Sequence, residues 1–188
     1  MFFVISLLQK IFKKTIVSLT VSKSDVYVHL NDVKALRSFL LFLRDSTWFQ
    51  CKQLLDIVCV DYPTYTERFE LTYVLLSVRF NFRFFVKISV LDQEVVPTIS
   101  DIFCSSNWLE REIWDMFGVF FQNHPDLRRI LTDYGFNGYP LRKDFPLTGF
   151  VELRYDDTEK RIVQEVLDIS QEFRFFSFLM PWEKEKKI

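Results

Sequence analysis

The chain has 188 residues, with 24 Lys and Arg against 25 Asp and Glu, so its formal net charge is −1. This balance excludes a protein that acts chiefly through a polybasic arm that binds nucleic acid. The content of 49% apolar residues excludes a chain that is disordered throughout. The longest run without a charged residue, Met116 to Pro125, spans 10 residues, whereas a membrane-spanning helix needs roughly 20. We therefore expect one domain, with or without an appended segment, and no transmembrane segment.

Cysteine and histidine are too few and too scattered for a metal centre. The three cysteines, Cys51, Cys59 and Cys104, show no C-x-x-C spacing, and only His29 and His124 could supplement them. Structural zinc and iron–sulfur clusters usually need four such ligands. We expect no disulfide framework and no metal, and we expect the cysteines to behave as small buried hydrophobic residues.

The first residues predict a short amphipathic helix followed by a β-hairpin. Residues 1–14 do not resemble a signal peptide, because the lysines follow the apolar run instead of preceding it. Apolar and polar residues then alternate over 15–21 and 26–30 around a polar turn, which indicates two paired strands. His29 falls on the polar parity and is expected to be an exposed strand residue.

A helix and three strands complete the first half. Apolar residues at helical spacing over 33–43 predict an amphipathic helix, with Asn31 or Asp32 as its N-cap. Strands are predicted at 54–60, 69–75 and 80–90; in the last, every even-numbered residue is apolar and the odd-numbered ones are mostly polar. This order predicts an α+β fold, a small mostly antiparallel sheet with helices on one face, plus an extended, irregular C-terminal segment.

A second amphipathic helix is predicted over residues 107–117. Asn107 and Glu110 have the spacing of a capping box. Gly118 is expected to end the helix in the left-handed conformation. Arg111 and Asp115 are four residues apart and are expected to pair weakly.

The segment after this helix combines turn residues, charges and aromatic side chains. All four glycines and three of the six prolines lie between residues 118 and 149, whereas no glycine precedes residue 118, which excludes a phosphate-binding glycine loop in the first half. One interpretation is a solvated loop. A second makes His124 a general base oriented by Asp126 or Asp133, but no nucleophile motif supports it. The third, an extended segment ordered by packing on another protein, is favoured because interface cores are rich in Arg and aromatic residues.

At these residues the chain resembles one known family. The run Glu110-Arg-Glu-Ile-Trp-Asp-Met-Phe-Gly118 continues through His124-Pro-Asp-Leu-Arg-Arg-Ile-Leu131 and on to Lys143-Asp-Phe-Pro146. This motif resembles the thirty-kilodalton subunit of respiratory complex I, NADH:ubiquinone oxidoreductase. Leu55 to Pro63 resembles the corresponding strand of that family, and the resemblance covers roughly residues 30 to 182.

The resemblance implies a function in an assembly. The family has an α+β domain whose C-terminal extension lies over neighbouring subunits, chiefly the forty-nine-kilodalton subunit that helps to form the quinone site. Members of the family have no cofactor of their own; FMN and the iron–sulfur clusters belong to other subunits. The whole complex passes electrons from NADH to ubiquinone and pumps protons, so the isolated chain is expected to be non-catalytic and to bind no nucleic acid.

The resemblance also implies three regions and a set of interface residues. The regions are an α+β sheet domain with an N-terminal helix (1–106), the motif helix with its charged aromatic loop (107–150) and an extension that wraps a partner (151–188), which ends in a solvated tail of alternating Glu and Lys. The residues expected to order the loop and contact other subunits, without catalytic, cofactor or metal roles, are Glu110, Arg111, Glu112, Asp115, His124, Asp126, Arg128, Arg129, Asp133, Tyr134, Arg142, Lys143 and Asp144.

The phenylalanine content bears on the origin of the chain. A stand-alone, Phe-rich chain with no Arg before Arg37, and therefore without an Arg-rich transit peptide, resembles a form encoded inside a mitochondrion. We expect it on the matrix side of the inner membrane. The alternative is a subunit of a related bacterial or plastid quinone-reducing complex.

Overall fold

The computed structural model describes residues 8–22, 25–168, 172, 174 and 176. Residues 8–11 are helical, and Leu8 is buried. Phe12 packs edge-on against Phe39 and Phe42 of the following helix, with ring centroids 4.9 and 5.3 Å apart. These contacts confirm the described part of the predicted N-terminal helix. Residues 1–7 and the predicted solvated tail lie outside the described residues.

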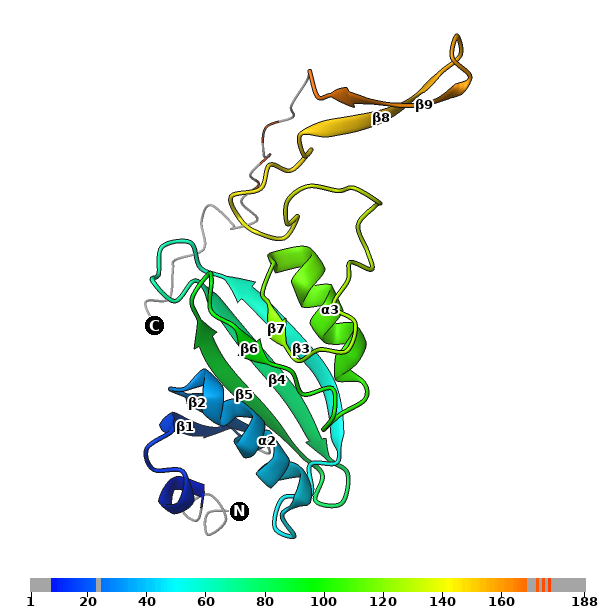
Figure 1. Cartoon of the computed structure of the whole chain (residues 1–188). Helices are drawn as coiled ribbons and strands as arrows, with labels where there is room; N and C mark the ends of the chain where they lie inside the picture. Colours follow the sequence, from blue (N-terminus) through cyan, green and yellow to red (C-terminus); the bar gives the residue numbers. More distant parts are fainter. Residues whose placement is uncertain (1–7, 23–24, 169–171, 173, 175, 177–188) are drawn as a thin grey trace. The chain divides into compact units, whose positions relative to one another are not determined.

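Five strands form the main sheet, in the order β1-β2-β5-β4-β3. The strands are β1 (Ile16–Ser22), β2 (Asp25–Leu30), β3 (Gln53–Asp61), β4 (Phe69–Ser77) and β5 (Phe82–Val90). Neighbours are antiparallel except β2 and β5, which run parallel. The parallel pair requires a crossover connection, which the helix after β2 begins. The predicted mostly antiparallel α+β sheet is confirmed (Figure 1).

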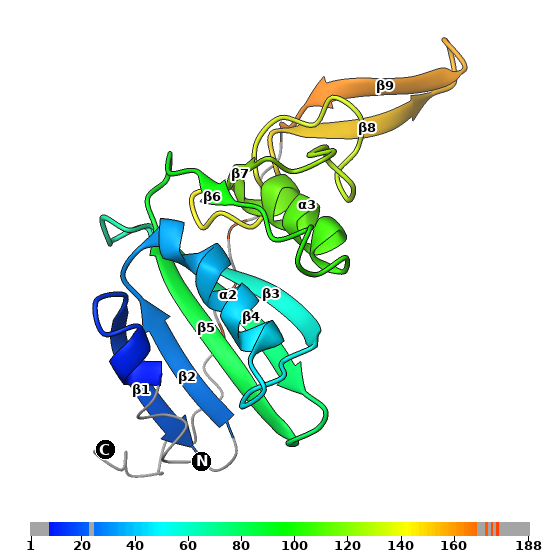
Figure 2. The ribbon, with the colours of Figure 1, turned by 60° about the horizontal axis from the view of Figure 1, so that its bottom comes forward.

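Helices cover one face of this sheet. They are the short 3-10 helix η1 (Val33–Ala35), α2 (Leu36–Asp45) and α3 (Ser106–Phe117), and Figures 1 and 2 show α2 and α3 on the same side. The predicted stripe of Val33, Leu36, Leu40 and Leu43 is buried. The backbone N–H of Lys34 donates to the carboxylate of Asp32 at 2.9 Å, so Asp32 is the N-cap of η1.

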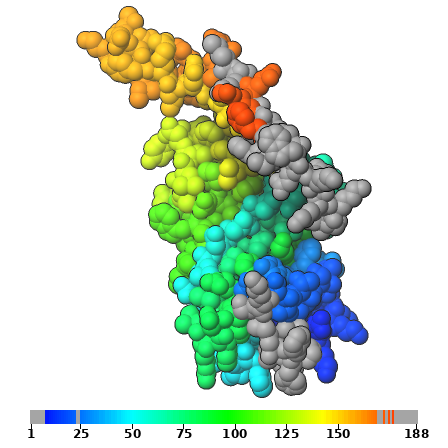
Figure 3. Space-filling model, turned by 180° about the vertical axis from the view of Figure 1, so that it is seen from behind, coloured from blue at the N-terminus to red at the C-terminus, as the bar shows by residue number. Residues whose placement is uncertain are grey.

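The sheet face toward the helices is apolar and dry. Residues at alternating positions of β4 and, from Phe84 on, of β5 are buried. Phe80 was expected on this face, which is wrong: it lies in the turn before β5, where Asn81 has φ 51°, and it is 44% exposed. On the opposite face Tyr27 stacks on Phe85, with centroids 4.6 Å apart. Figure 3 shows the molecule from behind, and on this side cyan and green atoms from the middle of the chain are exposed.

The cysteines and His29 differ in part from expectation. Cys51 and Cys59 are buried, and burial raises the pKa of the Cys51 thiol to about 12. Cys104 is exposed, so the expectation of burial is wrong for this residue. His29 is half-buried, and its Nε2 lies 3.2 Å from Ser89 Oγ on the neighbouring strand.

Contacts along the chain divide it into two units, residues 1–144 and 145–188. In the first unit, the two-residue strands β6 (Val96–Pro97) and β7 (Phe121–Gln122) pair in parallel and bring the segments before and after α3 together. In the second unit, β8 (Val151–Asp156) and β9 (Arg161–Val166) form an antiparallel hairpin.

Candidate functional site

The motif helix α3 begins differently from the prediction. Its N-cap is Ser105, which makes no side-chain capping bond, so the predicted capping box of Asn107 and Glu110 is wrong. The Glu110 carboxylate instead accepts hydrogen bonds from Thr98 Oγ1 (2.5 Å) and from the backbone N–H of Ile99 (2.9 Å). Because Glu110 is fully buried, it needs partners inside the protein, and the segment that follows β6 supplies them.

His124 lies beside Glu110 with a buried side chain. The backbone N–H of Asp126 donates to His124 Nδ1 (3.1 Å), so Nε2 carries the ring hydrogen and donates to the carbonyl of Asn107 (3.2 Å). His124 Nε2 is 3.9 Å from a Glu110 oxygen. Both ring nitrogens are engaged in a dry site, and the Asp126 carboxylate pairs with Arg128 at 2.8 Å. Neither of the predicted orienting carboxylates, Asp126 or Asp133, bonds to the ring, since Asp133 accepts the backbone N–H of Tyr134.

Burial raises the pKa of Glu110 to about 7, although hydrogen bonds from Thr98 and Ile99 oppose the shift. The folded state therefore holds this proton more tightly than the unfolded chain, whose pKa is near 4.5. The stabilisation is complete below pH 4.5 and is lost as the pH rises through 7, which amounts to about 3 kcal/mol.

Glu110→Gln is expected to remove this pH dependence, because the amide does not titrate. Urea unfolding of the full chain at pH 5 and pH 8 measures the effect. The matched variant Glu112→Gln changes an exposed carboxylate of the same helix and should keep the wild-type slope. If the free energy of unfolding of Glu110→Gln still falls from pH 5 to pH 8, another group is responsible for the titration.

Asp115, one turn further along α3, anchors the loop that follows. Its buried carboxylate accepts the successive backbone N–H groups of Ile130, Leu131 and Thr132 at 3.1, 2.7 and 2.9 Å. The Thr132 hydroxyl (2.6 Å) and Arg129 Nη1 (3.0 Å) also donate to it. Burial alone would raise the pKa of Asp115, but these hydrogen bonds outweigh it and lower the pKa to about 2. The loop therefore folds around a carboxylate that is ionised at neutral pH.

Two arginines of the motif also bind this loop. Arg111 Nε donates to the carbonyl of Arg128 at 3.1 Å, and Arg129 Nη2 donates to the carbonyl of Gly138 at 2.9 Å. The predicted pair of Arg111 with Asp115 is therefore wrong, because Asp115 pairs with Arg129. Exposed i,i+4 pairs are weak, and the buried carboxylate instead takes a cation that approaches from the loop.

Arg142 closes the loop onto the C-terminal end of α3. Its Nε donates to the carbonyl of Phe117 at 2.6 Å, and its Nη2 pairs with Asp92 at 2.9 Å. The guanidinium lies over the rings of Tyr139 and Phe69, 4.7 and 5.1 Å from their centroids. The Arg142 side chain is only 17% exposed, so its bonds are made within the chain.

A third buried carboxylate, Asp61 at the end of β3, holds the far end of the loop. Arg68 binds it with two parallel hydrogen bonds, of 2.7 and 3.0 Å, and the backbone N–H of Lys143 adds a third at 2.8 Å. The pair with Arg68 lowers the pKa of Asp61 against the opposing effect of burial. Arg68 also reaches Asp144 at 3.0 Å.

The remaining motif residues face outward. Arg128, with a side chain 72% exposed, makes an ion pair with Asp126 that is open to solvent. The exposed motif residues are Glu112, Asp126, Arg128, Asp133, Tyr134, Lys143 and Asp144. Leu131 and Leu141 of the same loop are also exposed. The predicted residues thus separate into a buried set that holds the loop and an exposed set that it presents.

Asp61, Arg68 and Thr98 are partners of the motif that the sequence did not predict. Asp61 comes directly after the predicted strand 54–60, and a carboxylate that is buried at such a position needs a cation nearby. Nothing in the spacing pointed to Arg68 or Thr98, because their pairing depends on the path of the chain between strands.

The described residues offer neither a metal cluster nor a membrane-spanning helix. No group of three or more His, Cys, Asp or Glu side chains is placed to hold a metal ion in this part of the chain. Within the same residues, no helix has both the length and the apolar character needed to cross a bilayer.

Comparison with known proteins gives consistent matches. The family model "Respiratory-chain NADH dehydrogenase, 30 Kd subunit" matches residues 28–151. NADH-ubiquinone oxidoreductase subunit 9 of Acanthamoeba castellanii is 52% identical over 97% of this chain and 93% of its own length. A subunit of the NADH-quinone oxidoreductase of Paramagnetospirillum magneticum is 53% identical over 77% of this chain and 72% of its own. A chain from the solved structure of the membrane-bound sulfane sulfur reductase, an archaeal respiratory membrane complex, superposes with a TM-score of 0.65 at 27% identity, covering 77% of this chain and 84% of that one.

Proposed function

The chain belongs to the family of the 30 kDa subunit of respiratory-chain NADH dehydrogenase, and we propose that within the complex it is a non-catalytic support for the forty-nine-kilodalton subunit that helps to form the quinone site. As a family member it is a subunit of the peripheral arm of NADH:ubiquinone oxidoreductase, and its partners are other subunits of that complex. Membership of the family does not by itself define the role of the chain in assembly, and the proposal concerns that role.

The observation that carries this proposal is that, in the loop after α3, one set of residues fixes the backbone and another set is exposed. The buried carboxylate of Asp115 fixes the backbone of residues 130–132, so this part of the loop is ordered by bonds within the chain, whereas the favoured interpretation of the sequence had a partner protein order it. The same backbone presents Arg128, Leu131 and Tyr134 to solvent. Arginine and tyrosine are enriched in the residues that dominate binding energy at protein interfaces, and a preorganised loop loses little entropy when it docks.

The β8–β9 hairpin supports the idea that the C-terminal extension wraps a partner. Val151 pairs opposite Val166, and Tyr155 pairs opposite Ile162, so these four side chains and Leu153 share one face of the hairpin. All five side chains are exposed. An isolated two-stranded hairpin is marginal in water, and exposed apolar patches mark interaction sites.

The absence of a redox centre is part of the same proposal. Relatives from Solanum tuberosum and Arabidopsis thaliana carry the name "NADH dehydrogenase [ubiquinone] iron-sulfur protein 3", yet this sequence has three cysteines, fewer than the four thiolates that a cluster usually needs. Electrons would pass through other subunits. The proposed location is the matrix side of the mitochondrial inner membrane, with a bacterial or plastid complex as the alternative.

Substitutions in the exposed set test the interface. Arg128→Ala combined with Tyr134→Ala is expected to reduce incorporation of the chain into the complex about ten-fold or more, since each anchor contributes on the order of 1–2 kcal/mol. The thermal stability of the purified full chain should stay unchanged, because both side chains face solvent. Native-gel quantification of the assembled complex measures incorporation.

Arg142→Ala is the informative contrast. Because the bonds of Arg142 are internal, its loss should lower the stability of the chain itself. Assembly should then decrease in proportion to this loss of stability. Normal assembly of the Arg128 and Tyr134 double variant would overturn the interface assignment. Turnover of NADH or quinone by the purified chain would overturn the non-catalytic role.

A further inference from the structure

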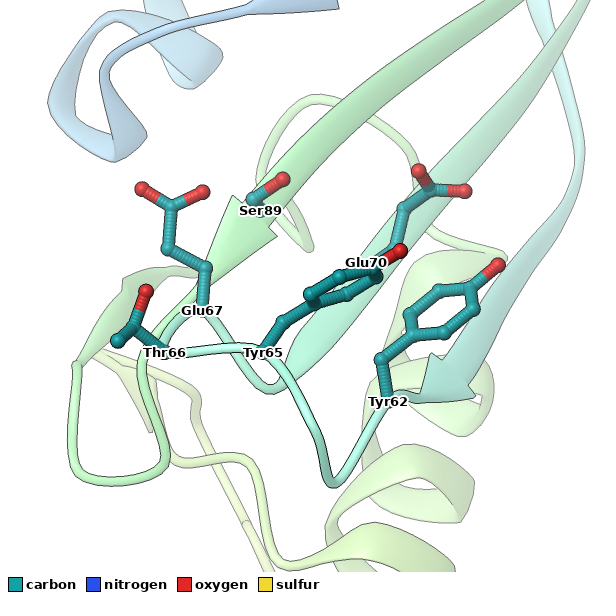
Figure 4. A pocket seen from close by; sticks show the side chains of 6 residues that line it. All are labelled: Tyr62, Tyr65, Thr66, Glu67, Glu70 and Ser89. Atoms are coloured by element: carbon teal, nitrogen blue, oxygen red, sulfur yellow. The ribbon is translucent and has the colours of Figure 1, made fainter.

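An open pocket lies at the β3–β4 loop, apart from the motif loop. Its volume is about 410 Å³, and it is lined by Tyr62, Tyr65, Thr66, Glu67, Glu70 and Ser89. In Figure 4 the carboxylates of Glu67 and Glu70 and the hydroxyl groups of both tyrosines extend to the same side of the loop. The rings of Tyr62 and Tyr65 are 5.6 Å apart at a tilt of 45°. The pocket therefore combines two aromatic rings with two carboxylates.

The loop that carries this pocket is held in place at its base. The backbone N–H of Tyr62 donates to the carbonyl of Arg68 at 2.8 Å, which closes the loop, and that of Tyr65 donates to the carbonyl of Tyr62 at 3.1 Å. At the same base, Arg68 forms its two-bond pair with the buried Asp61. The backbone of the loop is thus held at its base before any ligand arrives, which lowers the entropic cost of binding.

Only one of the two carboxylates that line the pocket has a partner among the described residues. One oxygen of Glu70 accepts from Lys87 Nζ at 2.8 Å on the neighbouring strand. Glu67, by contrast, forms no hydrogen bond or ion pair with any of the described residues. Lys143 Nζ lies 5.6 Å from the Tyr62 ring centroid but does not line the pocket. One carboxylate, that of the exposed Glu67, thus has no cation of the described residues bound to it in the pocket that the exposed ring of Tyr65 also lines.

We infer that this pocket binds an arginine side chain of another polypeptide of the complex, with the guanidinium paired to Glu67 and stacked on Tyr65. A guanidinium suits the site because it is planar, pairs with a carboxylate through two N–H groups and stacks on aromatic faces. A cation over a tyrosine ring is attracted by the electrons of its face. The choice of a polypeptide partner rests on the proposed function, whereas the chemistry of the pocket does not.

The first experiment tests the chemistry with the purified full chain. N-acetyl-arginine amide is the probe, and the neutral isostere N-acetyl-citrulline amide is the control. Tyrosine resonances in NMR spectra should shift saturably with the arginine probe and not with citrulline, and Glu67→Gln should weaken binding about three-fold to ten-fold. The matched variant Glu112→Gln should bind as the wild type does. Equal shifts with arginine and citrulline would overturn the inference.

The second experiment tests the occupant in the assembled complex. A photo-cross-linking amino acid replaces Thr66, which lines the pocket, and the cross-linked peptides are sequenced. The expected product is one recurrent peptide from another polypeptide of the complex that contains arginine, and Glu67→Lys should reduce its yield at least about five-fold. A complex that assembles normally without an arginine-containing product would refute the pocket inference while leaving the proposed function intact. Failure of the unlabelled wild-type chain to enter any complex would instead refute the proposed function.

Discussion

Asp115→Ala is expected to destabilise the chain by about 3–5 kcal/mol, because it removes the carboxylate and leaves Arg129 and three backbone N–H groups without their acceptor. That is a large fraction of the stability of an ordinary domain. The loop over residues 129–132 should lose its order first. Chemical denaturation of the full chain at pH 7 measures the loss, and hydrogen exchange of the 130–132 amides locates it.

The pH dependence gives an independent measure of the same group. The pKa of Asp115 falls from 3.8 to about 2 on folding, so its contribution is present above pH 3.8 and is lost as the pH falls through 2. The wild-type chain should lose about 2 kcal/mol over this range from Asp115, and Asp115→Ala should not.

Asp133→Ala is the matched control for both measurements. Asp133 is exposed, and its carboxylate accepts the backbone N–H of its neighbour Tyr134 at 2.7 Å. Its replacement should change stability by less than about 1 kcal/mol. Comparable losses in the two variants would mean that the burial and bonding of Asp115 contribute little.

The sheet and the helices were accessible from the sequence because each segment buries one face. Period-two alternation in 69–75 and helical spacing in 33–43 depend on local geometry, and the structure confirms both. The parallel contact of β2 with β5 was not predicted, since alternation shows which face a strand buries but not which strand lies beside it. The prediction for Phe80 was wrong for a related reason. The alternation of apolar residues continues through the turn in the sequence, but side chains in the turn do not alternate between the two faces of the sheet.

The motif charges were identified in the sequence but their partners were not. Local rules assigned Glu110 to a capping box and Asp115 to Arg111, because those rules consider only neighbours on the same helix. Both carboxylates are buried and bind groups 11 or more residues away, Glu110 to Ile99 and Asp115 to Leu131. A buried carboxylate must be paired, and the fold, not the spacing, decides which donor reaches it.

Gly118→Ala is expected to cost about 3 kcal/mol, through two separate effects. Gly118 ends α3 with φ 79°, as the sequence predicted, and a side chain in this left-handed conformation costs roughly 1–2 kcal/mol. A Cβ there would also lie 2.6 Å from the ring of Tyr139 and 2.9 Å from Arg142 Nη2. Relieving such overpacking costs typically about 1–3 kcal/mol.

Gly135→Ala separates these two effects, because Gly135 has a similar φ of 72° and its Cβ would meet no atom within 4 Å. It should therefore show the conformational cost alone, about 1–2 kcal/mol. Denaturation midpoints of both variants give the difference. The excess in Gly118→Ala would measure how tightly Tyr139 and Arg142 pack against the end of α3. Since Tyr139 also lies under Arg129, with the guanidinium 5.1 Å from its ring centroid, displacing this ring would loosen the Asp115 anchor. Equal costs at the two glycines would mean that the ring moves aside freely and that the loop does not depend on this contact.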